Sequence, residues 1–284
     1  MPFVTSHQRC VTVTAPDLMT RTAPAWDPAA MPSTPDPHSH SDRAASFSTG
    51  ADVYARVRPT YPTEAVDWMV PRDADRVLDL AAGTGLLTGR LVSRGHDVVA
   101  VDASRPMLDE LTATLPGVTT HVGTAEDIPL PDGSVDAVTV GQAWHWFDPP
   151  RAAAELARVL RPGGTLAVVW NDRDERIDWV GRFGEILHAG DALRPDNDQS
   201  AHPPSLGDAF DPIEAAEFRW LYRLATADLR TLAGTRSYLL TLPPEQREQL
   251  LQRVDDLVVT HPDLAGTTEV AMPYVTTAYR ARRR

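Results

Sequence analysis

The sequence predicts an α/β protein built on one open, doubly wound, mostly parallel seven-stranded sheet with an antiparallel last strand. Short apolar runs alternate with helical segments between residues 76 and 170. These runs are nearly continuous, which is typical of parallel strands that are buried on both faces. Beyond residue 170 the alternation stops, and two late strand-like segments enclose helices. This change favours an antiparallel hairpin added to the parallel sheet.

The expected elements follow the chain in a regular order. A short helix is expected over residues 63–70, with Thr63 as its N-cap and Glu64 in its first turn. Parallel strands joined by helices follow, with strands at 76–80, 97–101, 119–122, 137–140 and 165–170, and helices at 86–93, 106–115 and 150–160. The remaining elements are helices at 179–189, 228–240 and 244–260 and strands at 218–224 and 269–280.

The chain divides into a tail and one domain. Residues 1–46 are rich in Pro, Ser, Thr, Asp and His without periodicity, so they are expected to be disordered. The domain is expected over residues 47–284, with a cofactor-binding core at 76–170. Its C-terminal half, 171–284, is expected to cover the acceptor pocket and to end in the hairpin.

Composition narrows the function classes. The net charge of −12 argues against a nucleic-acid partner, since phosphate binding needs clustered basic side chains. Cys10 is the only cysteine, which fits a reducing compartment, and no apolar run approaches the ~18 residues needed to span a bilayer. We therefore expect a cytoplasmic protein, monomer or homodimer, without a membrane partner and without a visible metal site.

The most informative segment runs from Val77 to Thr88. It reads as strand, tight turn and helix, and a second strand follows that ends at Asp102. Asp79 and Asp102 then lie at the carboxyl ends of adjacent parallel strands, where open α/β sheets bind ligands. Gly83 and Gly85 are expected to let the backbone approach a ligand, and Asp102 to accept ribose hydroxyls. The pattern predicts a nucleoside-containing cofactor.

Two details of this loop separate the possible cofactors. A dinucleotide fingerprint needs a third glycine where this chain has Thr88. Asp79 lies within the loop, where it would repel a pyrophosphate but attract an ammonium group. Both details favour a cofactor that combines ribose and adenine with a free amino acid.

The motifs resemble those of the class I S-adenosylmethionine-dependent methyltransferases, which have a Rossmann-like fold. Asp79-Leu-Ala-Ala-Gly-Thr-Gly85 matches their first motif, with Ala81 at the usual first glycine, where it is tolerated if its φ is negative. The resemblance implies further contacts with the cofactor. It assigns them to Asp102 on the ribose, Met107 on the adenine, the backbone of Ala125, and the side chain of Thr124, Glu126 or Asp127.

Two further segments resemble a subgroup that includes the methyltransferase type 11 and trans-aconitate methyltransferase-like proteins. They are Phe47–Pro62 and Gly141–Asp148. Gln142, Trp144 and Trp146 are expected near the methionine portion of the cofactor.

His145 is either a general base or a packed, orienting residue among aromatic neighbours. Tyr54, Arg58 and Tyr61 either hold a carboxylate, of the cofactor or of an acidic substrate, or serve capping and packing.

We therefore predict methyl transfer from S-adenosylmethionine to a small-molecule carboxylate, hydroxyl or amine by in-line displacement. The alternatives are an NAD(P)-dependent oxidoreductase and a non-catalytic nucleoside-binding protein on the same fold.

Overall fold

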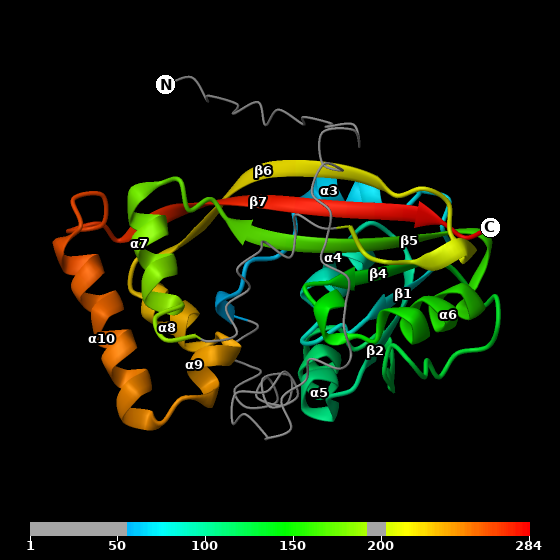
Figure 1. The fold of residues 1–284 in the computed structure, drawn as a ribbon, viewed down its shortest axis with the longest axis horizontal. Helices are drawn as coiled ribbons and strands as arrows, with labels where there is room; N and C mark the ends of the chain where they lie inside the picture. Colours follow the sequence, from blue (N-terminus) through cyan, green and yellow to red (C-terminus); the bar gives the residue numbers. More distant parts are fainter. Residues whose placement is uncertain (1–55, 192–202) are drawn as a thin grey trace.

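The computed structural model describes residues 56–191 and 203–284, which contain a seven-stranded sheet in the order β3-β2-β1-β4-β5-β7-β6 (Figure 1). Its strands are β1 (Arg76–Leu80), β2 (Asp97–Asp102), β3 (Thr119–Val122), β4 (Val135–Gly141), β5 (Leu160–Arg173), β6 (Glu214–Ala225) and β7 (Glu269–Arg282). The first five strands are parallel to one another, whereas β7 runs antiparallel to β5 and β6. The predicted doubly wound sheet with an antiparallel last strand is confirmed.

Helices cover both faces of the sheet because successive strand residues face opposite sides. On one face, Leu91 of α4 (Leu86–Ser93) packs in a cluster with Val98 of β2, and α3 (Thr63–Met69) joins that cluster. On the same face, α5 (Arg105–Thr114) packs on Ala100. On the other face, Leu156 of α6 (Pro149–Val159) packs in a cluster with Val99.

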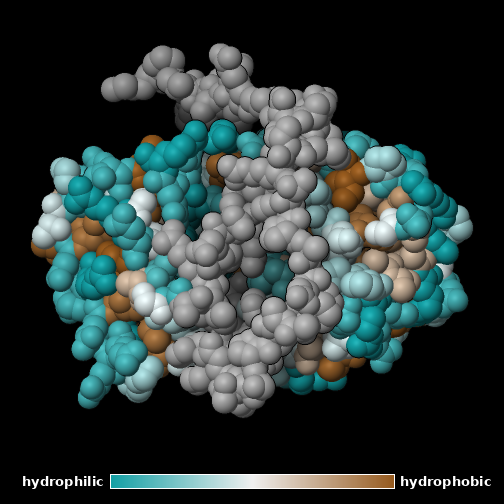
Figure 2. Space-filling model, in the orientation of Figure 1, coloured by the Kyte–Doolittle hydropathy of each residue, from teal (hydrophilic) through white to brown (hydrophobic). Residues whose placement is uncertain are grey.

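A second apolar core lies at one end of the long β6 and β7 strands. The helices α7 (Asp178–Leu187), α8 (Asp228–Gly234), α9 (Ser237–Thr241) and α10 (Pro244–Thr260) gather there, and we call them the helical lobe (Figure 1). Phe183 and Val254 are completely buried in this core, and Tyr274 of β7 joins them. The surface over both ends of this face of the molecule is mostly hydrophilic, with scattered apolar residues (Figure 2).

The helix predicted over residues 228–240 is interrupted in the structure. Gly234 ends α8, and Arg236 has an extended backbone with a ψ of 134° before α9 begins. The carbonyl oxygen of Thr235 accepts a hydrogen bond of 2.8 Å from Arg58 Nη2, which gives this carbonyl a partner outside the helix. A contact with a residue 177 positions earlier in the chain therefore accompanies the interruption.

Smaller differences concern boundaries. Thr63 is the first helical residue of α3, and the N-cap position is taken by Pro62 without a side-chain cap. The strand expected over 165–170 extends over Leu160–Arg173 because its pairing with β7 continues to Arg173. The expected tail, residues 1–46, and the expected domain start at residue 47 lie outside the described residues.

Candidate functional site

The candidate site lies at the carboxyl edge of the sheet, where the strand order reverses. From β1 the chain proceeds outward to β2 and β3, then returns to β4 on the other side of β1. Asp79 of β1 is paired with Ala100 of β2 and with Thr139 of β4. The segments that follow β1, β2 and β4 therefore meet at the edge where such sheets bind ligands. These segments carry half of the predicted site residues.

The glycine-rich loop after β1 contains three left-handed residues. The φ angles are 56° at Ala81, 56° at Gly83 and 86° at Gly85. The condition under which alanine would be tolerated at position 81, a negative φ, is not met. An L-residue with a side chain is strained there, at a cost of roughly 1–2 kcal/mol, whereas glycine is not.

The two glycines have different roles. A Cβ on Gly85 would lie 2.8 Å from Cγ of Leu111, so this glycine is needed for close packing against α5. The structure thus gives Gly85 a packing role, and its expected role in the approach of a ligand stays a prediction. A Cβ on Gly83 would meet nothing within 4 Å among the described residues, which leaves open space beside the loop.

Asp102, at the end of the adjacent strand β2, is hydrogen-bonded to the loop. Its Oδ2 accepts a hydrogen bond of 2.8 Å from the N–H of Gly83, and its Oδ1 accepts one of 2.8 Å from the N–H of Ser104. Burial raises the pKa of Asp102, and the two backbone hydrogen bonds oppose that shift. A carboxylate offers about four lone-pair positions, so Asp102 retains capacity for a ligand's hydroxyls.

Asp79 lies beneath the loop and is only 1% exposed. Its carboxylate accepts hydrogen bonds from Thr88 Oγ1 at 2.6 Å and from Thr139 Oγ1 at 3.0 Å. Burial raises the pKa of Asp79 to about 6, while the two hydroxyls act in the opposite direction. Thr88 therefore supports this buried acid at the position where a dinucleotide fold would have its third glycine.

The segment predicted to contact adenine follows β3. The N–H of Gly123 donates to the Asp102 carbonyl at 3.1 Å, which places the segment beside the end of β2. Thr124 and Asp127 exchange backbone hydrogen bonds of 3.3 Å, and Ala125 between them is buried. Glu126 Oε1 instead accepts a hydrogen bond of 2.9 Å from the Asp148 N–H, just before α6. The Glu126 carboxylate thus supports the start of α6.

Met107 and the residues after β4 complete the edge. Met107 is buried on α5. Gln142 has a φ of 60°, its N–H donates to the Val169 carbonyl at 2.9 Å, and its Nε2 donates to the Asn171 carbonyl at 3.0 Å. These bonds hold a left-handed residue at the turn that leads into the aromatic segment.

The aromatic segment is a tight turn over Trp144–Trp146. Trp144 is buried and meets Phe147 edge-on, with ring centroids 5.7 Å apart. The His145 ring lies 4.4 Å from the Trp146 ring, tilted by 46°. This geometry is that of a packed aromatic turn.

Of the three residues predicted to hold a carboxylate, the structure describes Tyr61 and Arg58. Tyr61 is buried against the end of β4, where a Cβ on Gly141 would lie 2.5 Å from its hydroxyl. Arg58 donates from Nε to Thr235 Oγ1 at 2.9 Å and from Nη2 to the Thr235 carbonyl, so it links the N-terminal segment to α8. Tyr54 lies outside the described residues.

Sequence reasoning missed a buried amide that joins the two halves of the molecule. Asn171 of β5 donates from Nδ2 to the Thr60 carbonyl at 2.9 Å and accepts at Oδ1 from Thr276 Oγ1 at 2.5 Å. Trp220 Nε1 of β6 in turn donates to Thr276 Oγ1 at 2.8 Å. The only sequence signal for this network is an amide at the end of an apolar strand.

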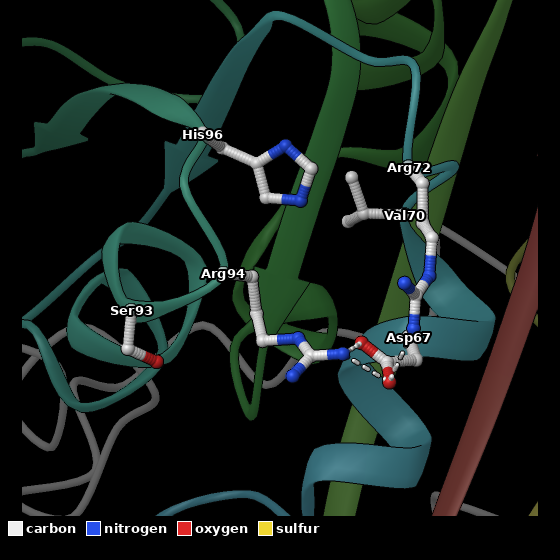
Figure 3. A pocket seen from close by; sticks show the side chains of 6 residues that line it. All are labelled: Asp67, Val70, Arg72, Ser93, Arg94 and His96. Atoms are coloured by element: carbon white, nitrogen blue, oxygen red, sulfur yellow. Dashed lines mark hydrogen bonds and ion pairs between the residues drawn. The ribbon is translucent and has the colours of Figure 1, made fainter.

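A cavity of about 450 Å³ lies away from this edge, at the amino ends of β1 and β2 (Figure 3). Arg72 and Arg94 both point toward the carboxylate of Asp67 there, and Arg94 forms a close ion pair with it. The His96 Nδ1 lies 2.7 Å from the Ala74 carbonyl. None of the predicted site residues lines this cavity, so it is separate from the candidate site.

Residues 56–191 and 203–284 contain neither a membrane-spanning helix nor a cluster of metal-binding side chains. No helix there is both long and apolar enough to cross a bilayer. No three or more His, Cys, Asp or Glu side chains in those ranges are grouped so that they could hold a metal ion.

Comparisons with known proteins identify the family. A methyltransferase domain model matches residues 78–168. The chain is 49% identical over 243 residues to an uncharacterized methyltransferase of Mycobacterium tuberculosis, covering 86% of this chain and 98% of that protein. It is 33% identical over 245 residues to an uncharacterized methyltransferase of Schizosaccharomyces pombe, covering 84% and 97%.

A solved structure agrees with the sequence matches. The structure of a putative type II methyltransferase from Anaeromyxobacter dehalogenans covers 80% of this chain and 97% of its own, with a TM-score of 0.59 and 28% identity. This match covers more of the chain than the family model does. The chain therefore belongs to the methyltransferase family, as a class I enzyme that depends on S-adenosylmethionine.

Proposed function

We propose that the carboxyl edge between β1, β2 and β4 binds S-adenosylmethionine and presents it to a small-molecule acceptor. The observation that carries this proposal is the pair of carboxylates on either side of the left-handed loop, that of Asp79, which is buried, and that of Asp102, which is partly buried. Asp102 is held by two backbone N–H groups and retains lone pairs for ribose hydroxyls. Asp79 supplies negative charge beneath the loop, which favours a cationic amino group over a pyrophosphate.

Polar atoms around the loop support the fit of a nucleoside ligand. Thr84 Oγ1 and Ser104 Oγ are buried and have no hydrogen-bond partner among the described residues. Buried polar atoms are nearly always paired in native proteins, so two such hydroxyls beside one loop favour a ligand at this place. The open space next to Gly83 lies at the same loop. The remaining predicted contacts, from Met107, Thr124 and Ala125, belong to the segments that follow the ends of β2 and β3.

The protein's contribution to the reaction is binding and alignment. When bound, S-adenosylmethionine supplies an activated methyl group that an acceptor carboxylate, hydroxyl or amine takes by in-line displacement. Holding two reactants in line contributes up to about 7–11 kcal/mol, so no nucleophile of the protein is needed. We assign this alignment to Gln142, Trp144 and Trp146, which follow β4, and to Tyr61, which packs against its end.

We assign His145 an orienting role. Its ring lies against Trp146 in the aromatic turn, and the neighbouring Trp144 is buried. A general base would contribute about 10²–10⁴-fold with an alcohol or amine acceptor. We therefore expect His145→Asn to keep the affinity for S-adenosylhomocysteine and the shape of the pH profile of kcat/KM. If the decrease of kcat/KM near neutral pH disappears in this variant, His145 would instead act as a general base.

The proposal is tested by incubating the full chain with S-adenosylmethionine and a panel of acids, phenols and amines. Release of S-adenosylhomocysteine and a mass increase of one methyl group in one acceptor would support it. Binding of S-adenosylhomocysteine without turnover of any acceptor would favour the non-catalytic alternative. Binding of NAD in its place would favour the oxidoreductase alternative.

A further inference from the structure

Arg173 is the last residue of β5 and lies at the carboxyl edge of the sheet, beyond Asn171. Asn171 and Thr276 are paired across β5 and β7, and their side chains are hydrogen-bonded to each other. Because side chains alternate along a strand, Arg173 and its pairing partner Tyr274 face the same side of the sheet as Asn171. Arg173 therefore lies on the same face as Asn171, at the carboxyl edge where we propose that the acceptor binds.

The Arg173 side chain is buried, with 9% of it exposed. Its guanidinium lies 5.6 Å from the Phe183 ring of α7, at the second apolar core. Its Nη2 lies 3.5 Å from Glu175 Oε1, and the Glu175 side chain is 40% exposed. The Nε of Arg173 is buried and has no hydrogen-bond partner among the described residues.

This environment does not supply enough hydrogen-bond acceptors for the Arg173 guanidinium, which is permanently charged. A guanidinium stays charged in proteins and carries five N–H donors in a fixed plane. One long ion pair and one aromatic ring leave its Nε–H unpaired, and such groups in native structures call for an explanation. The planar donors of a guanidinium match the oxygens of a carboxylate or phosphate.

Arg173 is also close enough to the proposed site to contact an acceptor. Gln142, which we place beside the transferred methyl, bonds the carbonyl of Asn171, two residues before Arg173. Two strand residues span about 7 Å, the scale of a small metabolite. Arg58, which was predicted to hold a carboxylate of the cofactor or of an acidic substrate, donates from Nε and Nη2 to Thr235.

We propose that Arg173 is a specificity-determining residue that binds an oxyanion group, carboxylate or phosphate, on the methyl acceptor. This inference rests on the proposed function, because it assumes that the acceptor approaches the carboxyl edge. It concerns the group by which the acceptor is recognised, which need not be the group that is methylated.

The test uses the full chain saturated with S-adenosylhomocysteine. Succinate, benzoate and phenyl phosphate are titrated against succinamide, benzamide and phenol, and binding is followed by thermal unfolding. At least one oxyanion compound is expected to raise Tm more than its neutral counterpart. Arg173→Gln is expected to weaken that oxyanion's Kd about tenfold or more, while calorimetry shows unchanged affinity for S-adenosylhomocysteine.

Control variants distinguish binding of the oxyanion by Arg173 from an indirect effect of the substitution on the structure. Glu175→Gln removes the ion pair but keeps the guanidinium, and should retain the oxyanion's Kd within about threefold. Arg176→Gln removes an exposed arginine that is paired with Asp174, and should also leave it unchanged. If Arg173→Gln fails to fold, Arg173→Lys replaces it. Lys keeps the charge without the planar donors, so we expect the same direction of change.

Several results would overturn the inference. They are the absence of any preference for an oxyanion compound, an unchanged Kd in the Arg173 variant that folds, and an equal loss in Glu175→Gln. A tenfold loss of affinity for S-adenosylhomocysteine in the Arg173 variant would mean that this residue holds the donor's carboxylate instead. Failure of the wild-type chain to bind S-adenosylhomocysteine at all would refute the proposed function, a result distinct from these.

Discussion

The half of the molecule that holds the parallel strands β1 to β5, which we call the parallel half, differs from the C-terminal half in its contacts. The residues that bond each other are closer in sequence in the parallel half than those that hold the C-terminal half in place. In the parallel half, Asp79 is supported by Thr88, nine residues away, and by Thr139, 60 residues away, and Asp102 is supported by Gly83, 19 residues away. The C-terminal half is joined to the N-terminal segment by Arg58, which bonds Thr235 across 177 residues.

The same difference separates the two proposed halves of the site. The donor side consists of short motifs that a single stretch of chain encodes. The acceptor side combines residues from distant parts of the chain, such as Tyr61, Gln142 and Arg173, and Arg173 lies outside the segments that resemble a known subgroup.

The largest predicted effect concerns the donor side. Asp102→Ala removes the acceptor of two backbone N–H groups and the proposed ribose ligand. We expect the affinity for S-adenosylhomocysteine to fall about 100-fold or more, as measured by calorimetry, since hydrogen bonds to charged groups are worth about 1.5–3 kcal/mol each. Asp97→Ala, at the exposed opposite end of β2, is the control and should bind normally. Equal affinities of the two variants for S-adenosylhomocysteine would mean that Asp102 does not bind the ligand.

The second prediction concerns the pH dependence of stability. The pKa of Asp79 is raised from 3.8 to about 6 in the folded protein, so the folded state binds more protons than the unfolded state between these values. The charged carboxylate therefore destabilises the fold as pH rises from about 4 to 6, by about 3 kcal/mol in total.

Urea unfolding of wild type and Asp79→Asn across pH 4 to 8 measures this difference. Because the amide does not titrate, the free energy of unfolding of the variant should gain about 2–3 kcal/mol relative to wild type between pH 4 and pH 7. A difference between the two proteins that stays constant with pH would contradict the raised pKa.

The third prediction tests the connection between the halves. Asn171→Ala leaves the Thr60 carbonyl and the Thr276 hydroxyl without their partner at a buried position. The free energy of unfolding should fall by roughly 2 kcal/mol, or about 4–8 °C in Tm. Thr114→Val removes a hydroxyl that bonds only within its own helix and should cost less than about 0.5 kcal/mol. A similar loss of free energy of unfolding in both variants would mean that the hydrogen bonds of Asn171 do not help to hold the two halves together.

The smallest predicted effect concerns the loop itself. Ala81 has a φ of 56°, so Ala81→Gly should relieve strain and raise the free energy of unfolding by about 0.5–1 kcal/mol. Ala82 is not among the left-handed residues, and Ala82→Gly should lower it by a similar amount. Chemical denaturation distinguishes the two variants by the sign of the change. Destabilisation by both would show that the loop is not strained at Ala81.

The sequence predicted the parallel half well because its signals are local. The predicted bounds of β1, α4 and β3 agree with the structure, and Asp79 and Asp102 lie where the strand pattern placed them. The only sequence signal for the φ at Ala81 is that the resembling family usually has glycine there, since no residue nearby in the chain requires a left-handed alanine.

The acceptor side could be predicted only in outline. The late strands and helices were recognisable from their periodicity, but the position of a side chain such as Arg173 or Asn171 depends on pairing with β7, more than 100 residues away. The interruption between α8 and α9 is accompanied by a contact with Arg58 and is likewise non-local.

Calorimetric titration of the full chain with S-adenosylhomocysteine and with NAD tests the central claim most directly. We predict saturable binding of S-adenosylhomocysteine at one site per chain, strongly weakened in Asp102→Ala, and no binding of NAD. Binding of NAD without binding of S-adenosylhomocysteine would contradict the assignment of the carboxyl edge to the methyl donor.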